Sequence, residues 1–165
     1  MAPTVQRFNW RRHSQAVIEF QRETYEVNFP GFKATPQFLR DYGSELRKAV
    51  SNPCESLYVL EDGDRVCGFL WVSLIGTMVD PCVGYIRNIY VAPDLRGQGW
   101  GRKLLQVAED WCRSQGVDRI ALDASCCNER AVELYRRSGY ETARLRMEKR
   151  LEPDRDGPGG MSREQ

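Results

Sequence analysis

The stretch Val91–Leu105, VAPDLRGQGWGRKLL, decides the fold, because it places three closely spaced glycines between a β-rich run and a helical one. The run before it, GYIRNIY, is rich in β-branched and aromatic residues, and after it apolar residues recur at helical spacing. A strand that ends near Pro93 and passes directly into a helix leaves the first N–H groups of that helix without intrahelical partners. This stretch therefore predicts a turn that attracts anions.

The glycine turn matches neither of two common phosphate-binding motifs. A dinucleotide fingerprint, G-x-G-x-x-G, requires a third glycine where this chain has Arg102. A P-loop requires four residues between its glycines, whereas three separate Gly97 from Gly101. The residues alone leave open a glycine-rich turn that binds an anion through its backbone and one that binds nothing.

Length and charge favour one domain with a small or local partner. We expect residues 1–151 to form a single domain, followed by a polar Gly- and Pro-rich tail at 152–165. The 24 basic and 23 acidic residues nearly balance, which argues against binding to nucleic acid or to a membrane surface. No apolar run approaches the roughly 18 to 20 residues of a membrane span, and residues 1–12 lack the apolar body of a signal peptide. These features predict a cytoplasmic protein.

Cysteine and histidine usage argues against a metal site. The six cysteines include no C-x-x-C pair, and His13 is the single histidine of the chain. A histidine metal cluster or a Ser-His-Asp triad is therefore not expected. Cys126 and Cys127 precede a predicted helix start, so a reactive thiol there stays open.

The first half of the chain alternates helical and β-rich patterns. A short strand is predicted at Thr4–Trp10, followed by a helix capped by Ser14. A second helix opens at Thr35–Pro36, where a capping residue precedes proline at the first helical position. Residues 56–75 form two β-rich runs around Asp62–Gly63, which predicts an antiparallel hairpin.

The second half predicts a βαβ unit followed by a helix and a strand. Residues 84–93 form a strand that leads into the glycine turn, and the helix after that turn ends at Gly116. Residues 118–125 form the next strand, parallel to 84–93 if the helix is a crossover. A helix at 129–138 and strand-like residues at 140–151 complete an α/β chain.

Two segments, IYVAPDLRGQGWG and ALDASCCNERAVELYRRSGY, resemble the GNAT superfamily of N-acetyltransferases over residues 56–151. Arg96, Gly99 and Gly101 meet the superfamily signature of Arg or Gln, two residues, glycine, any residue, then Gly or Ala. The resemblance implies a central mixed, mostly antiparallel sheet of about seven strands, flanked by about four helices, with one parallel βαβ crossover. It also implies transfer of an acetyl group from acetyl-coenzyme A to a primary amine, by direct attack in a ternary complex, without a metal.

The resemblance also implies which residues bind the coenzyme. Backbone N–H groups of the glycine turn hold the pyrophosphate, the preceding strand lies along the pantetheine, and the Ile89 N–H donates to the acetyl carbonyl. Asn128 caps its helix and also contacts the coenzyme. Trp100 is either a ligand contact or a packing anchor. The expected coenzyme-binding residues are Ile89, Tyr90, Val91, Arg96, Gly97, Gln98, Gly99, Trp100, Gly101, Arg102, Asn128 and Tyr135.

The resemblance makes Tyr135 the general acid, which protonates the departing coenzyme sulfur. An unperturbed tyrosine is protonated at neutral pH and needs no tuning for this role. Many members use a glutamate as the general base at the position where this chain has Tyr85, so that base is missing here. Asp123 is the alternative base, directly or through a water, although backbone groups could equally satisfy its carboxylate.

The acceptor is a small-molecule amine or a peptide or protein N-terminus. In the superfamily the first two helices and their loop help to form the acceptor wall. Here the first helix mixes aromatic residues with Glu19, Glu23 and Glu26, which suits a cation but equally a solvated helix face. The alternative function is a non-catalytic acyl-coenzyme A binding module. The protein is expected to be a monomer or a homodimer.

Overall fold

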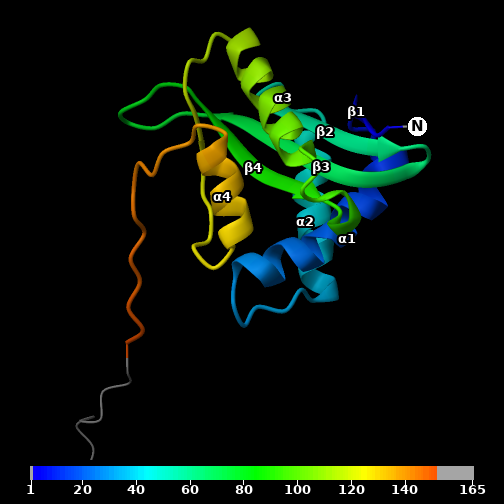
Figure 1. Ribbon diagram of the computed structural model, residues 1–165, viewed down its shortest axis with the longest axis horizontal. Coiled ribbons are helices and arrows are strands. Elements are labelled where there is room, and N and C mark those ends of the chain that lie inside the picture. The colour runs from blue at the N-terminus through cyan, green and yellow to red at the C-terminus, as the bar shows by residue number, and fades with distance from the viewer. Residues whose placement is uncertain (1, 152–165) are drawn as a thin grey trace, which may run out of the picture.

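The computed structural model describes residues 2–151, which form one five-stranded mixed sheet with helices on both faces (Figure 1). The predicted tail at 152–165 lies outside the described residues. The strands follow the order of the chain across the sheet, β1-β2-β3-β4-β5. They are β1 (Thr4–Arg7), β2 (Glu55–Asp62), β3 (Arg65–Ile75), β4 (Val83–Val91) and β5 (Ile120–Leu122). The helices are α1 (Trp10–Asn28), α2 (Pro36–Ala49), α3 (Trp100–Ser114) and α4 (Glu129–Arg137), with a 3-10 turn at Pro93–Leu95.

The first helix begins five residues earlier than the sequence suggests. Asn9, not Ser14, is its cap: the Asn9 side chain accepts a hydrogen bond from the Arg12 N–H at 3.2 Å. The Asn9 N–H in turn donates to His13 Nδ1 at 2.8 Å, so the two residues satisfy each other's polar groups. This reciprocal cap ends β1 at Arg7, so Trp10 belongs to the helix and the predicted strand Thr4–Trp10 is too long.

The second helix and the hairpin form as predicted. The Thr35 side chain accepts from the Phe38 N–H at 3.1 Å, and Pro36 occupies the first helical position. Gly63 lies between β2 and β3 with a φ of 60°, the left-handed conformation that a tight hairpin turn requires. Both features depend on residues adjacent in sequence, which is why the sequence reveals them.

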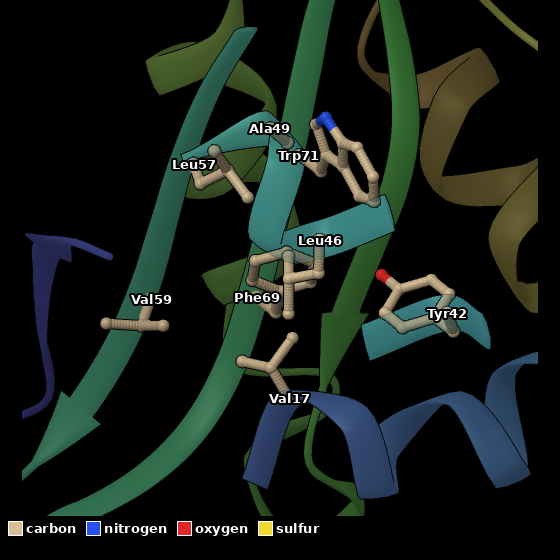
Figure 2. Packing of buried hydrophobic residues seen from close by; sticks show 8 residues of the cluster. All are labelled: Val17, Tyr42, Leu46, Ala49, Leu57, Val59, Phe69 and Trp71. Carbon is tan, nitrogen blue, oxygen red and sulfur yellow. The ribbon is translucent and has the colours of Figure 1, made fainter. Parts of the chain in front are cut away.

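Two apolar layers sandwich the sheet. On one face, α1 and α2 pack on β2 and β3 through the buried cluster in Figure 2, to which β3 contributes Phe69 and Trp71. On the other face, Leu70 and Val72 of β3 pack against the apolar stripe of α3. Successive β3 residues therefore point to opposite faces, and both faces are buried.

The central crossover is confirmed. β4 and β5 pair in parallel through Gly84, Tyr85 and Ile86, and α3 connects them. Gly84 allows α3 to approach the sheet closely, because a Cβ atom there would lie 2.3 Å from Cys112 Sγ. The glycine is thus required by the packing of the crossover.

The sheet is smaller than expected, with five strands among the described residues instead of about seven. The predicted strand at 140–151 is wrong: after Tyr140 the chain leaves the sheet, and residues 141–151 are exposed and join no ladder within the described part (Figure 1). Alternating apolar residues form a strand only where a partner edge lies alongside. Here β5 is three residues long and the chain runs away from it.

Within residues 2–151, no helix has both the length and the apolar character that crossing a bilayer requires.

Candidate active site

Strands β4 and β5 separate at the site where the sequence places the coenzyme. Parallel pairing between β4 and β5 ends at Ile86 and Leu122. Between the pairs Val72–Ile86 and Trp71–Asn88 the β3–β4 register shifts, so Arg87 is an extra, bulged residue on β4. Beyond this bulge, no strand among the described residues pairs with the β5-facing edge of β4. That edge, residues 87–91, carries Ile89, Tyr90 and Val91, whose backbone groups fit an extended partner.

The glycine turn presents backbone donors in open space. Gly97 and Gly99 adopt left-handed φ values of 77° and 87°, and a Cβ at either position would meet nothing within 4 Å. Gly99 caps α3, and the first helical hydrogen bond is donated by the Lys103 N–H to the Gly99 carbonyl at 3.0 Å. The N–H groups of Trp100, Gly101 and Arg102 precede that bond. They and the exposed Arg102 and Lys103 side chains fit an anionic group such as a pyrophosphate.

Gly101 has a different role from the other two glycines. A Cβ there would lie 2.8 Å from Leu134 Cδ2, so this glycine allows α4 to pack against the start of α3. Leu134 precedes Tyr135 in sequence, and both belong to the cluster around Leu104 and Leu105 of α3. Gly101 therefore brings the helix that carries Tyr135 close to the turn.

The side chain of Arg96 is engaged within the protein. Its guanidinium lies 2.6 Å from Glu23 Oε1 on α1 and donates to the Val91 carbonyl at 2.8 Å. The Tyr90 hydroxyl donates to the same carboxylate at 2.9 Å, and the Tyr90 ring stacks on Phe20. Arg96 therefore ties the turn to α1, and its charge is already neutralised by Glu23.

The remaining turn residues are held by packing and by a local hydrogen bond. Gln98 Nε2 donates to the Asp94 carbonyl at 2.8 Å. Trp100 packs against the buried cluster of Leu60, Cys67 and Ala92. Trp100 is thus the packing anchor that was one of its two predicted roles.

Asn128 caps α4 as predicted and also joins it to α1. The Asn128 side chain accepts from the Ala131 N–H at 3.3 Å, while its Nδ2 donates to Asn28 Oδ1 at 3.2 Å. Further along α4, Tyr135 packs in the α3 cluster, and burial raises its pKa to about 12. The Tyr135 phenol is therefore protonated throughout the neutral range.

Tyr85 and Asp123, which the sequence suggested separately, form a direct hydrogen bond. The Tyr85 hydroxyl donates to Asp123 Oδ2 at 2.7 Å, so β4 holds the carboxylate that follows β5. Burial, together with the hydrogen bond to Asp123 and its charge, raises the pKa of Tyr85 to about 12. Tyr85 is therefore a neutral donor that holds the Asp123 carboxylate in place. Their separation in sequence concealed this contact.

A cleft of about 810 Å³ lies beside this pair, between α2 and the sheet. Its wall contains aromatic and charged side chains in equal number, and most of the charged residues come from α2. The lining residues are Tyr25, Phe38, Asp41, Tyr42, Ser44, Glu45, Lys48, Ala49, Asn52, Glu55, Trp71, Tyr85, Arg87 and Asn88.

The glutamates of α1 do not line this cleft. Glu19 pairs with Arg22, Glu23 with Arg96, and Glu26 with Lys33. The carboxylates of the cleft belong instead to Asp41 and Glu45 of α2 and to Glu55 of β2. The sequence does not indicate that these carboxylates, and not those of α1, line the cleft, because helical spacing does not reveal which end of a helix covers the sheet. Among residues 2–151 no cluster of three or more metal-ligating side chains occurs.

Residues 15–140 match the acetyltransferase (GNAT) family. The chain is 29% identical over 112 residues to aminoglycoside N(6')-acetyltransferase type 1 of Serratia marcescens, covering 64% of this chain and 76% of that protein. It is 27% identical over 117 residues to N-alpha-acetyltransferase 30 of Schizosaccharomyces pombe, covering 63% of this chain and 78% of that protein. These relatives act on different kinds of amine.

The fold is shared with solved structures. An aminoglycoside 6'-N-acetyltransferase of Acinetobacter haemolyticus superposes with a TM-score of 0.68 at 16% identity, over 92% of this chain and 99% of the other. The family match covers most of the chain, residues 15–140. The chain therefore belongs to the GNAT family and is an acetyl-coenzyme A-dependent N-acetyltransferase.

Proposed function

We propose that this protein acetylates a primary amine, of a small molecule or of a peptide or protein N-terminus, that binds in the cleft between α2 and β4. The observation that carries this proposal is the shared position of β4. Arg87 and Asn88 line the cleft, and the next residues, Ile89 to Val91, form the free strand edge. An acceptor in the cleft and a coenzyme along that edge would meet on one strand.

The backbone performs the coenzyme-binding role. The N–H groups from Gly97 to Arg102 hold the pyrophosphate, since the Arg96 N–H donates to the Pro93 carbonyl, and Ile89 to Val91 align the pantetheine. The Ile89 N–H donates to the acetyl carbonyl oxygen and stabilises the negative charge that develops there. Acetyl-coenzyme A supplies the thioester, whose carbonyl carbon accepts the amine.

Two side chains transfer the protons of the reaction. Asp123, directly or through a water, takes the proton that the amine loses as the C–N bond forms. Tyr135 donates its phenolic proton to the sulfur as the C–S bond breaks. Tyr85 positions Asp123 through the 2.7 Å hydrogen bond. Nitrogen thus loses a proton, and sulfur gains one.

Coenzyme A release from acetyl-coenzyme A tests the function across peptide N-termini, polyamines, amino acids and aminoglycosides. We expect release that depends on one class of amine. Saturable coenzyme binding with no turnover on any amine would support the alternative function, an acyl-coenzyme A binding module. The observation that favours this alternative is that Tyr85 occupies the position where many family members have a catalytic glutamate.

Asp123→Asn tests the base. We expect kcat/KM for the acceptor to fall about 10²-fold, because the amide accepts no proton, while the Kd for acetyl-coenzyme A stays within about twofold, as expected for a residue that does not contact the coenzyme. Asp118→Asn is the matched control, since Asp118 is also exposed and lies at the other end of the same segment. Equal activity of the two variants would remove Asp123 from the mechanism.

A further inference from the structure

Two buried polar atoms in the cleft have no hydrogen-bond partner within the described residues. They are Tyr42 Oη and Asn88 Oδ1, on side chains of residues that are 9% and 7% exposed. Both residues line the cleft between α2 and the sheet. One comes from the helix and the other from the strand, so the two residues flank the space where the acceptor is proposed to bind.

Leaving such atoms unpaired is costly. A buried donor or acceptor without a partner costs about 1–3 kcal/mol, and native proteins pair the large majority of them. Two unpaired atoms in one cleft therefore require an explanation other than packing. A bound molecule that carries complementary groups supplies one.

The neighbouring contacts involve other parts of these two side chains. Asn88 Nδ2 donates to Gln21 Oε1 at 2.7 Å, and Gln21 Nε2 donates to the Val17 carbonyl at 2.9 Å. This series of hydrogen bonds fixes the Asn88 amide and leaves its oxygen without a partner. The Tyr42 ring packs edge-on against Trp71, at 6.0 Å between centroids.

The position of Asn88 relates this pair of atoms to the reaction. Asn88 lies opposite Trp71 in the β3–β4 register and directly precedes Ile89, whose N–H is proposed to hold the acetyl carbonyl. A group bound to Asn88 Oδ1 would therefore lie next to the reacting amine. Burial raises the pKa of Tyr42 well above its usual range, so its hydroxyl stays protonated beside that group.

We propose that Tyr42 and Asn88 recognise the acceptor by hydrogen-bonding a second polar group close to its amine. This inference rests on the proposed function and narrows the acceptor class. Because Asn88 Oδ1 can only accept, the second group carries an O–H or an N–H. The acceptors are thus amines with a hydroxyl or a second amino group near the reactive nitrogen, and simple alkyl amines are poor substrates.

Tyr42→Phe separates this role from a structural one. Since the hydroxyl has no partner in the free protein, we expect its removal to leave Tm unchanged or higher. The KM for the acceptor rises about tenfold, the value of one lost hydrogen bond, and the KM for acetyl-coenzyme A stays constant. Tyr90→Phe is the matched stability control: its hydroxyl donates to Glu23 at 2.9 Å, so Tm falls.

Three amines of equal chain length test the chemical class: n-butylamine, 3-amino-1-propanol and 1,3-diaminopropane. We expect the native protein to prefer the second and third over the first by about 10²-fold or more in kcat/KM, because n-butylamine leaves the buried pair unsatisfied. In Tyr42→Phe we expect this ratio of kcat/KM values to fall about tenfold.

The outcomes distinguish this inference from the proposed function. Acetylation of all three amines at equal rates would confirm an amine acetyltransferase and overturn the recognition pair. Without turnover on any amine, the proposed function fails, and the Tm comparison alone decides the pair. A lower Tm of Tyr42→Phe then overturns it, because the hydroxyl would have a structural partner, and an unchanged or higher Tm supports it.

Discussion

Tyr135→Phe is expected to lower kcat about 10²-fold or more, with little change in the Kd for acetyl-coenzyme A. The phenylalanine ring keeps the packing in the α3 cluster, so coenzyme binding and folding persist. Only the proton for the departing sulfur is lost. Steady-state kinetics with a saturating acceptor give kcat, and calorimetric titration with acetyl-coenzyme A in the absence of acceptor gives its Kd.

The control for this variant is Tyr140→Phe. The Tyr140 ring lies 6.1 Å from that of Tyr135, and its hydroxyl donates to Glu109 at 3.4 Å, away from the proposed chemistry. We expect its kcat to stay near the native value. Native activity in Tyr135→Phe would show that water or another group protonates the sulfur.

The pH dependence of kcat is a second test of the role of Tyr135. Burial raises the pKa of Tyr135 to about 12, which favours the protonated form, so the acid remains intact as the pH rises through neutrality and is lost only near that value. The native kcat should therefore show no fall attributable to this tyrosine between pH 7 and about pH 10. An alkaline fall with a midpoint near the usual tyrosine value, absent from the variant, would contradict this environment.

Gly84→Ala is expected to reduce the free energy of unfolding by about 1–3 kcal/mol. The new methyl group would lie 2.3 Å from Cys112 Sγ, a distance that non-bonded atoms do not tolerate, so α3 must shift from the sheet. Urea denaturation followed by circular dichroism measures the loss.

A second substitution tests the cause of that loss. In the double variant with Cys112→Ala, the sulfur is absent, and the remaining neighbours of the methyl group, the Cys112 Cβ and the Arg119 carbonyl, lie at 3.4 Å. We expect the double variant to be more stable than the sum of the two single effects predicts. Strict additivity would mean that the contact with Cys112 is not responsible.

The features that the sequence predicts correctly are those encoded by neighbouring residues. The glycine turn, the Thr35 cap, the Asp62–Gly63 hairpin and the Asn128 cap each depend on a few residues in a row, and all four occur in the structure. Gly97 and Gly99 adopt the left-handed conformations that only such residues take easily. The proposed coenzyme half of the site is therefore readable from the chain, because backbone conformation makes most of it.

The errors arise where distant residues compete or fail to meet. Ser14 is a good cap in isolation, but Asn9 has His13 as a reciprocal partner and begins the helix first. The alternation at 140–151 suits a strand, yet among the described residues no edge lies beside it. Local preference is a weak term that tertiary contacts override.

The sequence by itself determined the family, the glycine turn and the order of the elements as far as α4, because these depend on short-range patterns. Only the tertiary structure decided that Tyr85 holds Asp123 and that α2, not the glutamates of α1, lines the cleft. It also left Tyr42 and Asn88 with buried, unpaired atoms. The physical reason is that an acceptor cleft is built from side chains far apart in sequence, whose meeting depends on how α1 and α2 cover the sheet.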